Sequence, residues 1–218
     1  MTKIILVRHG HVDGIMPHRF RGRVDLQLTS IGQEQARRTA MRIESAWRPA
    51  RIYSSPMSRS IATGRAIGAR FSLNVETDAG LNDLDFGNWQ GLTPVEARSR
   101  WPNEFDTWFR APHLANIPEG ESLQTVLARV TATLRTILSR HPNDVVVLVG
   151  HDSVNRIILL HAMDLPLSRY WRLRQDPCSI NEVNFSDGEF TLGSLNETWH
   201  LHCEHPAESA DAEVKMKT

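Results

Sequence analysis

The stretch "IILVRHGHV" (residues 4–12) decides the fold, because an apolar run ends abruptly in basic and polar residues. Residues 4–7 form a short run rich in β-branched side chains, which is typical of a buried strand. Arg8 and His9 follow this strand directly, and a second histidine, His11, comes two residues later. The pattern predicts a strand that carries a cation and an imidazole to one edge of a sheet.

The same pattern recurs far along the chain in "DVVVLVGH" (residues 144–151), the most apolar strand candidate, which ends at His151. Residues 179–198 alternate in the manner of a hairpin, with Asp187-Gly188 as its turn. Further strands are expected at 50–55 and within 73–84, and helices at 28–47, 56–71, 93–101, 103–111, 122–140 and 153–163. Strands that alternate with helices predict an α/β protein with a mostly parallel sheet.

Capping residues mark the expected helix starts. Thr29 or Ser30 is placed to cap the first helix, and Ser122 is placed to cap the long helix at 122–140. Ser55 followed by Pro56 predicts that the second helix is capped at Ser55 and begins at Pro56, where the missing N–H of proline costs nothing.

Length and composition indicate one ordinary globular domain. The chain has 218 residues, of which 40% are hydrophobic, enough to bury a sizeable core. We expect a single domain over residues 1–203, a cap segment at 93–120 and a disordered polar tail at 204–218.

Charge and cysteine usage bound the partners and the location. The formal net charge is zero, so no net field favours nucleic acid or a membrane surface. The two cysteines make no disulfide framework, and the N-terminal apolar run is too short for a signal peptide. These features predict a cytoplasmic protein.

The strand ends are expected to form an anion site. In open α/β sheets the site lies at the carboxyl ends of the strands, and His9 and His151 would face each other there if their strands are neighbours. The expected strand at 50–55 leads into a helix whose first turn carries Arg59, and a helix N-terminus itself favours anions. Two histidines, Arg8 and Arg59 at one point favour a phosphate pocket and phosphoryl transfer.

Five motifs in order carry a family resemblance: "LVRHG", "SSPMSRSIATG", "LNDLDFGNWQG", "PEGES" and "VGHDSVNR". Together they resemble the histidine phosphatase (phosphoglycerate mutase-like) superfamily over roughly residues 3–165. The resemblance implies a three-layer α/β sandwich, in which helices flank a mostly parallel central sheet.

The resemblance also implies roles for individual residues. His9 matches the nucleophile that becomes a phosphohistidine, and Arg8, Arg59 and His151 match the residues that hold the phosphate during catalysis. Asp83 lies at the position of the general acid and base. A neutral imidazole is a competent nucleophile at pH 7, and the cationic side chains supply charge without a metal or another cofactor.

Two departures from the family pattern leave alternatives open. The acid is usually Glu, and Asp83 is one methylene shorter. Asp152 directly follows His151, as in the acid phosphatase branch, and is therefore an alternative acid. A purely structural role for Asp152 is the N-cap of the helix expected at 153–163.

The segment after the first motif departs most from the family. Relatives often have Glu-Thr and then Trp-Asn, but here the chain reads "HVDGIMPH", with Ile15 near the position of the Asn. Residues in this segment that could contact the substrate are His11, Ile15, His18, Arg19, Arg21 and Gly22. The basic run at 19–23 is either a solvated loop or a binding site for distal anionic groups of the substrate.

Two other clusters are interpreted as structural. "WHLHCEH" (199–205) contains potential zinc ligands, and alternation on a strand would bring His200 and His202 to one face, but no second cluster completes a site. A metal is therefore not expected. The aromatic series Trp89, Trp101, Phe105, Trp108 and Phe109 is interpreted as core and cap packing rather than as a ligand platform.

The sequence thus predicts a phosphatase that hydrolyses small phosphorylated metabolites. A phosphoglycerate-type phosphomutase and a catalytically silent phosphate-ligand binding protein are the alternatives. The physiological substrate and the oligomeric state, a homo-oligomer included, are left open.

Overall fold

The computed structural model describes residues 1–15 and 18–202. This part of the chain forms a six-stranded sheet in the order β3-β2-β4-β1-β5-β6. The strands are β1 (Thr2–Arg8), β2 (Arg51–Ser54), β3 (Val75–Thr77), β4 (Val145–Gly150), β5 (Ile180–Ser186) and β6 (Glu189–Glu197). The first four are parallel, whereas β5 runs antiparallel to β1 and continues into β6. The predicted mostly parallel sheet and the predicted hairpin are confirmed.

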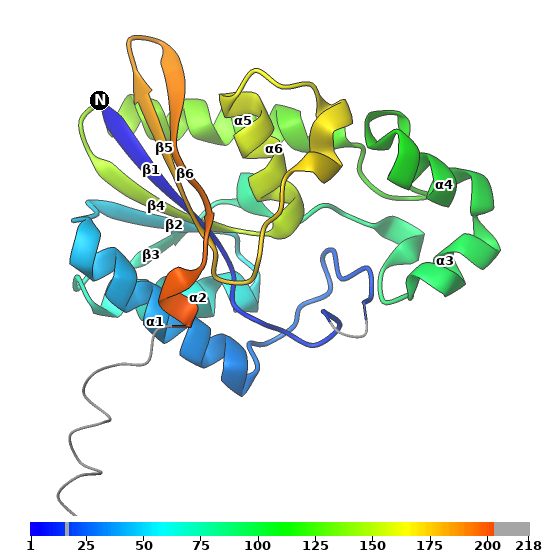
Figure 1. The fold of residues 1–218 in the computed structure, drawn as a ribbon, viewed down its shortest axis with the longest axis horizontal. Coiled ribbons are helices and arrows are strands. Elements are labelled where there is room, and N and C mark those ends of the chain that lie inside the picture. The colour runs from blue at the N-terminus through cyan, green and yellow to red at the C-terminus, as the bar shows by residue number, and fades with distance from the viewer. Residues whose placement is uncertain (16–17, 203–218) are drawn as a thin grey trace, which may run out of the picture.

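Helices cover both faces of the sheet, as Figure 1 shows, and complete the predicted three layers. They are α1 (Ser30–Ala46), α2 (Ser58–Ala69), α3 (Pro94–Arg100), α4 (Pro102–Arg110), α5 (Leu123–Arg140) and α6 (Asp152–Ala162). Ile5 and Val7 of β1 pack in one core cluster, while Ile4 and Leu6 pack in the other. This alternation follows from the two-residue period of a strand that is buried on both faces.

The start of α2 differs from the sequence prediction. The helix begins at Ser58 rather than at Pro56, and Ser55 does not cap it. The hydroxyl of Ser55 instead accepts a hydrogen bond from Met57 N at 3.3 Å, which closes a local turn. Asp25, from a distant loop, accepts hydrogen bonds from the backbone N (2.9 Å) and hydroxyl (2.6 Å) of Ser58. A tertiary contact therefore satisfies this helix terminus.

Three other helix starts test the capping predictions. Ser122 caps α5 as predicted, since its side chain accepts from Thr125 N. Thr29 caps α1, since its side chain accepts from Gly32 N, and this prediction is confirmed. Asp152 is the first residue of α6 and His151 is the N-cap, so the interpretation of Asp152 as the N-cap is wrong.

The segment that contains α3 and α4 lies beside the sheet layers rather than within them (Figure 1). Thr93 and Glu96 form a reciprocal capping box at the start of α3, and Pro102 is the first residue of α4. In the described part of the chain no helix is long and apolar enough to span a bilayer. The tail expected at 204–218 lies outside the described residues.

Candidate active site

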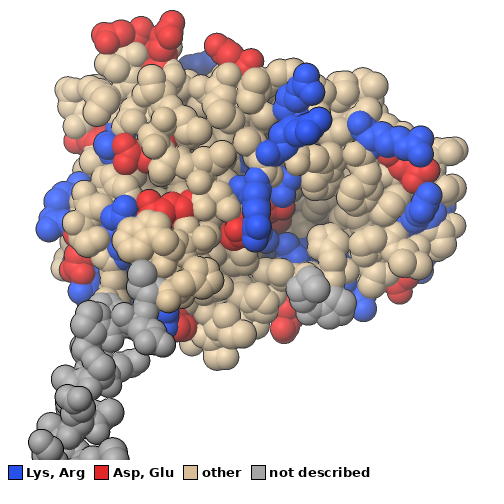
Figure 2. Space-filling view, in the orientation of Figure 1, with Lys and Arg blue, Asp and Glu red and all other residues tan. Residues whose placement is uncertain are grey.

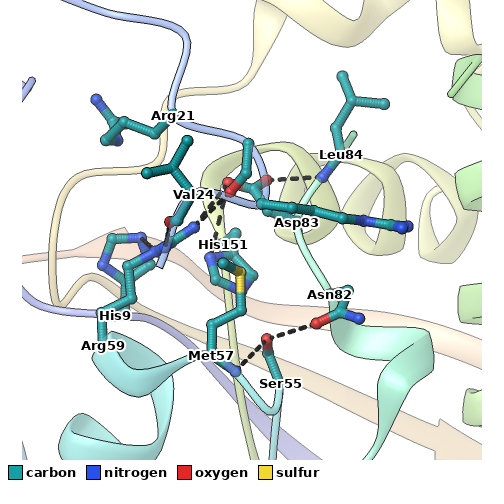
Figure 3. A network of polar contacts seen from close by, with 12 residues as sticks. His9, Arg21, Val24, Ser55, Met57, Arg59, Asn82, Asp83, Leu84 and His151 are labelled. Atoms are coloured by element: carbon teal, nitrogen blue, oxygen red, sulfur yellow. Dashed lines mark hydrogen bonds and ion pairs between the residues drawn. The ribbon is translucent and has the colours of Figure 1, made fainter. Parts of the chain in front are cut away.

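Two buried histidines meet at the carboxyl edge of the sheet. Parallel pairing of β1 with β4 places Arg8 opposite Gly150, so His9 and His151 follow neighbouring strands. Their rings lie 5.1 Å apart between centroids, at an interplanar angle of 61°. Both side chains are buried, and Figure 3 shows them in one network with Arg59 and Asp83. The two motifs therefore converge as expected.

The imidazole of His9 is held in one orientation. Its Nδ1 lies 2.7 Å from the carbonyl oxygen of Gly10, and because a carbonyl only accepts, Nδ1 must carry the proton. This leaves Nε2 as the nitrogen with a free lone pair, which accepts a hydrogen bond from Arg59 Nε at 3.2 Å. Burial, followed by the charges of Arg59 and Arg8, lowers the pKa of His9 well below 6.5. At neutral pH His9 is therefore uncharged and nucleophilic.

Arg59 is the most constrained cation of the site, with 0% of its side chain exposed. Its guanidinium donates to Val24 O (2.8 Å) and to Gly22 O (2.7 Å). Gly22 has a φ of +47°, and a Cβ there would approach Gln90 Oε1 at 2.6 Å. Only glycine fits this position without strain, so Gly22 contributes through its carbonyl and its conformation.

Two further arginines add positive charge. Arg8 is buried and donates to the carbonyl of Gln175, and its Nε has no partner among the described residues. Arg21 donates to Gly14 O at 2.7 Å, and its Nε is likewise unpartnered in that part of the chain. Burial and the charge of Arg8 lower the pKa of Arg21 to about 10, which leaves it cationic at neutral pH. These partly unpaired guanidiniums favour an anion between them.

Asp83 is the carboxyl group of this network. Its Oδ2 lies 3.4 Å from Arg59 Nη2 and 3.7 Å from His151 Nδ1. Burial raises the pKa of Asp83, although Arg59 and Arg21 act in the opposite direction. A carboxyl group with a raised pKa can carry a proton to a leaving group near neutral pH. Burial also disfavours the charged form of His151 and therefore lowers the pKa of this histidine.

Asp152 has different surroundings although it lines the same cavity. Its Oδ1 accepts a hydrogen bond from Arg156 Nε at 2.7 Å. This ion pair engages Asp152 with a cation on its own helix, whereas Asp83 contacts Arg59 and His151.

Sequence reasoning missed two supporting residues. Arg129 of α5 donates to the carbonyls of Asn82 (2.7 Å) and Asp83 (3.1 Å) and pairs with Glu121 at 3.0 Å. Glu121 belongs to the "PEGES" motif, so this motif was the signal in the sequence that could have pointed to Arg129. Gln175, which accepts from Arg8, follows no motif in the sequence.

A cavity of about 250 Å³ opens beside this network. Figure 2 shows the surface hollowed between the sheet layers and the α3–α4 segment. One end of the cavity contains Arg21, Gly22 and Asp83. The remaining lining is largely aromatic and comprises His18, Arg19, Phe20, Phe86, Pro94, Trp108, Phe109, Asp152, Ser153, Tyr170 and Trp171.

Not every substrate-binding candidate reaches this cavity. His18, Arg19, Arg21 and Gly22 line it, but His11 and Ile15 are absent from its lining. The Nδ1 of His11 lies 2.9 Å from the hydroxyl of Thr29, at the start of α1. Ile15 packs against a small apolar cluster. These contacts of His11 and Ile15 are with residues outside the cavity lining.

The aromatic series is divided between core and cavity. Trp89 is buried in the main core cluster, and Trp101 and Phe105 pack against that cluster. Trp108 and Phe109 also line the cavity. The interpretation as packing residues therefore holds for Trp89, Trp101 and Phe105, whereas Trp108 and Phe109 also belong to the cavity lining.

The His/Cys segment near the C-terminus does not follow the strand geometry considered for it. Trp199–Leu201 is a short 3₁₀ helix, and the Nε2 of the buried His200 lies 3.0 Å from Thr39 Oγ1. Cys203 and His205 fall outside the described residues. Within residues 1–15 and 18–202 no three His, Cys, Asp or Glu side chains are grouped to hold a metal.

The fold and the site together define an α/β protein with a buried, cation-rich pocket around a neutral histidine. The sequence profile of the histidine phosphatase superfamily (branch 1) matches residues 4–198. The chain therefore belongs to the histidine phosphatase superfamily.

Known relatives support this assignment. Phosphoserine phosphatase 1 of Hydrogenobacter thermophilus is 30% identical over 201 residues, which span 92% of this chain and 95% of that protein. The solved structure of Bacillus stearothermophilus YhfR is similar with a TM-score of 0.88 and 27% identity, covering 92% of this chain and 100% of that one. A phosphoserine phosphatase from Entamoeba histolytica in complex with 3-phosphoglyceric acid has a TM-score of 0.82 and 25% identity, covering 92% and 100%.

Proposed function

We propose that the protein is a phosphatase that hydrolyses small phosphomonoesters through a phosphohistidine on His9. The observation that carries this proposal is the orientation of His9, whose unprotonated Nε2 lies among cations. Nδ1 donates to Gly10 O, and Nε2 faces Arg59 at 3.2 Å and the ring of His151. A nucleophile, positive charge and the protonatable Asp83 are thus assembled beside a cavity that Arg21 and Asp83 line.

In the first step Nε2 of His9 attacks phosphorus, and the P–O bond to the leaving group breaks. The electron pair of that bond goes to the leaving oxygen, which takes the proton from the carboxyl of Asp83. Arg8, Arg59 and His151 hold the phosphoryl oxygens, and Arg21 adds a further positive charge. Electrostatic stabilisation of this kind supplies much of the rate enhancement in phosphoryl transfer.

In the second step a water molecule attacks the phosphohistidine. The carboxylate of Asp83 accepts a proton from that water as its oxygen bonds to phosphorus, and the P–N bond breaks. This restores His9 and protonated Asp83 and releases phosphate. Dividing the reaction in two lets one carboxyl group act first as acid and then as base.

Contacts favour Asp83 over Asp152 as the acid. Asp83 lies 3.7 Å from His151 and its pKa is raised by burial. Asp152 forms an ion pair with Arg156 of its own helix at 2.7 Å. Asp83 and His9 both contact Arg59, at 3.4 Å and 3.2 Å, so Asp83 belongs to the same network as the proposed nucleophile.

Activity assays test the proposal against both alternatives. The wild-type protein should release phosphate from p-nitrophenyl phosphate, and His9→Ala should lose at least about 10⁴-fold of that activity. A mutase would instead interconvert phosphoglycerates in the presence of 2,3-bisphosphoglycerate without releasing phosphate. A silent binding protein would bind phosphate and show neither activity. Either of these results would overturn the proposal.

The domain organisation and the location complete the proposal. A single domain over residues 1–203 with a cap at 93–120 suits a small phosphorylated metabolite as substrate. A cytoplasmic location stays a prediction from cysteine usage and apolar patterning.

A further inference from the structure

The cavity has an aromatic wall that the proposed reaction does not use. Phe109 and Trp171 stack on each other with ring centroids 5.3 Å apart and an interplanar angle of 9°. Trp108 meets Trp171 edge to face at 5.3 Å and 83°. Phe109 is 44% exposed and Trp171 is 39% exposed. Large aromatic side chains that remain exposed beside a cavity are unusual unless they contact something.

This wall is held in place before any ligand arrives. The indole Nε1 of Trp171 donates to the carbonyl of Trp108 at 2.9 Å. The guanidinium of Arg156 lies 5.2 Å from the ring centroids of both Tyr170 and Trp171. A wall fixed in this way loses little conformational freedom when a ligand binds.

The charges beyond the reaction centre do not suit a second anionic group. Arg19 donates to Gly91 O at 2.7 Å and lies 3.8 Å from Glu96. Arg156 is paired with Asp152, so the charge of this arginine is already offset. Arg21, the other arginine of the lining, interacts electrostatically with Arg8, Arg59 and Asp83. The arginines around His9 would therefore neutralise the phosphate that reacts. A carboxylate on the leaving group would instead meet the aromatic wall.

We propose that the site selects phosphomonoesters whose leaving group carries an uncharged, planar aromatic ring, which packs against Phe109 and Trp171. Esters with a carboxylate on the leaving group are poorer substrates. The inference rests on the proposed phosphatase activity and names the substrate class of the same site. Phe109 and Trp171 become specificity-determining residues that take no part in the chemistry.

The test compares esters whose alcohols have similar acidity, so that leaving-group chemistry does not mask binding. 3-Phenylpropyl phosphate and propyl phosphate form such a pair, and 3-phosphoglycerate supplies the carboxylate. Wild-type kcat/KM should be about tenfold higher for the phenylpropyl ester than for the propyl ester. Phe109→Ala and Trp171→Ala should each reduce this ratio about fivefold, mainly through KM.

Trp199→Ala is the matched control for Trp171→Ala. Trp199 is 54% exposed and is absent from the cavity lining, so its removal should leave the ratio unchanged. Loss of the ratio in Trp199→Ala as well would assign the effect to general destabilisation and overturn the specific role of Trp171.

A binding experiment separates failure of the inference from failure of the proposed function. Calorimetry with the His9→Ala protein should give a Kd for 3-phenylpropyl phosphate about tenfold below that for propyl phosphate. Equal dissociation constants, or tighter binding of 3-phosphoglycerate, would overturn the inference. If wild-type protein hydrolysed none of the esters, the phosphatase proposal would fail, whereas the binding ratio would still report on the aromatic wall.

Discussion

The two ends of the cavity are built in different ways. The cationic end consists of Arg21 and Asp83, which line the cavity, and of the buried His9, His151 and Arg59 beside them. These three come from the ends of β1 and β4 and from the start of α2. At the aromatic end, Phe109 and Trp171 come from α4 and from the 3₁₀ helix Leu167–Arg172, and both are partly exposed. The sheet fixes the first end, whereas segments beside it form the second.

This difference separates the reaction from the choice of substrate. Side chains at the ends of central strands cannot move without disturbing the core, so their spacing is rigid. Side chains on peripheral segments can change with little effect on the sheet. We therefore expect substitutions at the cationic end to affect catalysis for every ester, and those at the aromatic end to act on particular esters.

Among substitutions that keep the nucleophile His9, the largest expected effect is at Arg59. Arg59→Met removes the guanidinium that faces His9 Nε2 and should lower kcat/KM about 10³-fold for aromatic and propyl esters alike. Steady-state kinetics with both esters would measure this. Arg59→Lys, which keeps the charge but not the planar fork, should be less severe. A loss restricted to the aromatic ester would break the proposed division between the two ends.

The second largest effect is expected for the two carboxyl groups of the cavity, Asp83 and Asp152, whose substitution should change the rate of hydrolysis differently. Asp83→Asn removes the proposed proton donor and should slow hydrolysis of propyl phosphate about 10²-fold. It should affect p-nitrophenyl phosphate far less, because p-nitrophenolate leaves without protonation. Asp152→Asn is the matched control and should show no such dependence on the leaving group. The opposite pattern would make Asp152 the acid.

The free energy of unfolding should decrease as the pH is lowered, because two buried histidines resist protonation in the folded state. His9 and His151 have pKa values well below 6.5 when folded, so below pH 6.5 the unfolded chain binds protons that the folded chain does not. The loss should be on the order of 1 kcal/mol per histidine by pH 5.5. Urea denaturation at pH 7.5 and 5.5 would measure it.

The double variant His9→Gln/His151→Gln tests the origin of this slope. It should lose less stability than the wild type over the same pH interval, because its two glutamines do not titrate. Asp83 acts in the opposite direction, since its raised pKa favours the folded state as the pH falls. An unchanged slope in the double variant would contradict the assignment to these histidines.

The smallest effect is expected at the start of α3. Thr93→Ala removes one half of the capping box with Glu96 and should lower the free energy of unfolding by about 1 kcal/mol. Hydrolysis of propyl phosphate at a temperature where the variant is folded should not change. A large drop in that activity would show that the two ends of the cavity are coupled.

Several parts of the fold could be predicted from the sequence for local reasons. The apolar run ending at Arg8 and His9, the cap at Thr29 and the hairpin turn at Asp187-Gly188 depend on neighbours along the chain. The start of α2 was predicted wrongly, because Asp25, a residue distant in sequence, accepts hydrogen bonds from Ser58 at the first residue of that helix.

The sequence alone determined the order of strands and helices, the family motifs and the residue types that favour phosphate chemistry. It did so because periodicity and capping are local properties. Only the tertiary structure placed Asp83 beside His151, paired Asp152 with Arg156 and set His11 against Thr29. It also joined Phe109 to Trp171 in one wall. These contacts depend on how distant segments pack against the sheet, and no local pattern encodes that packing.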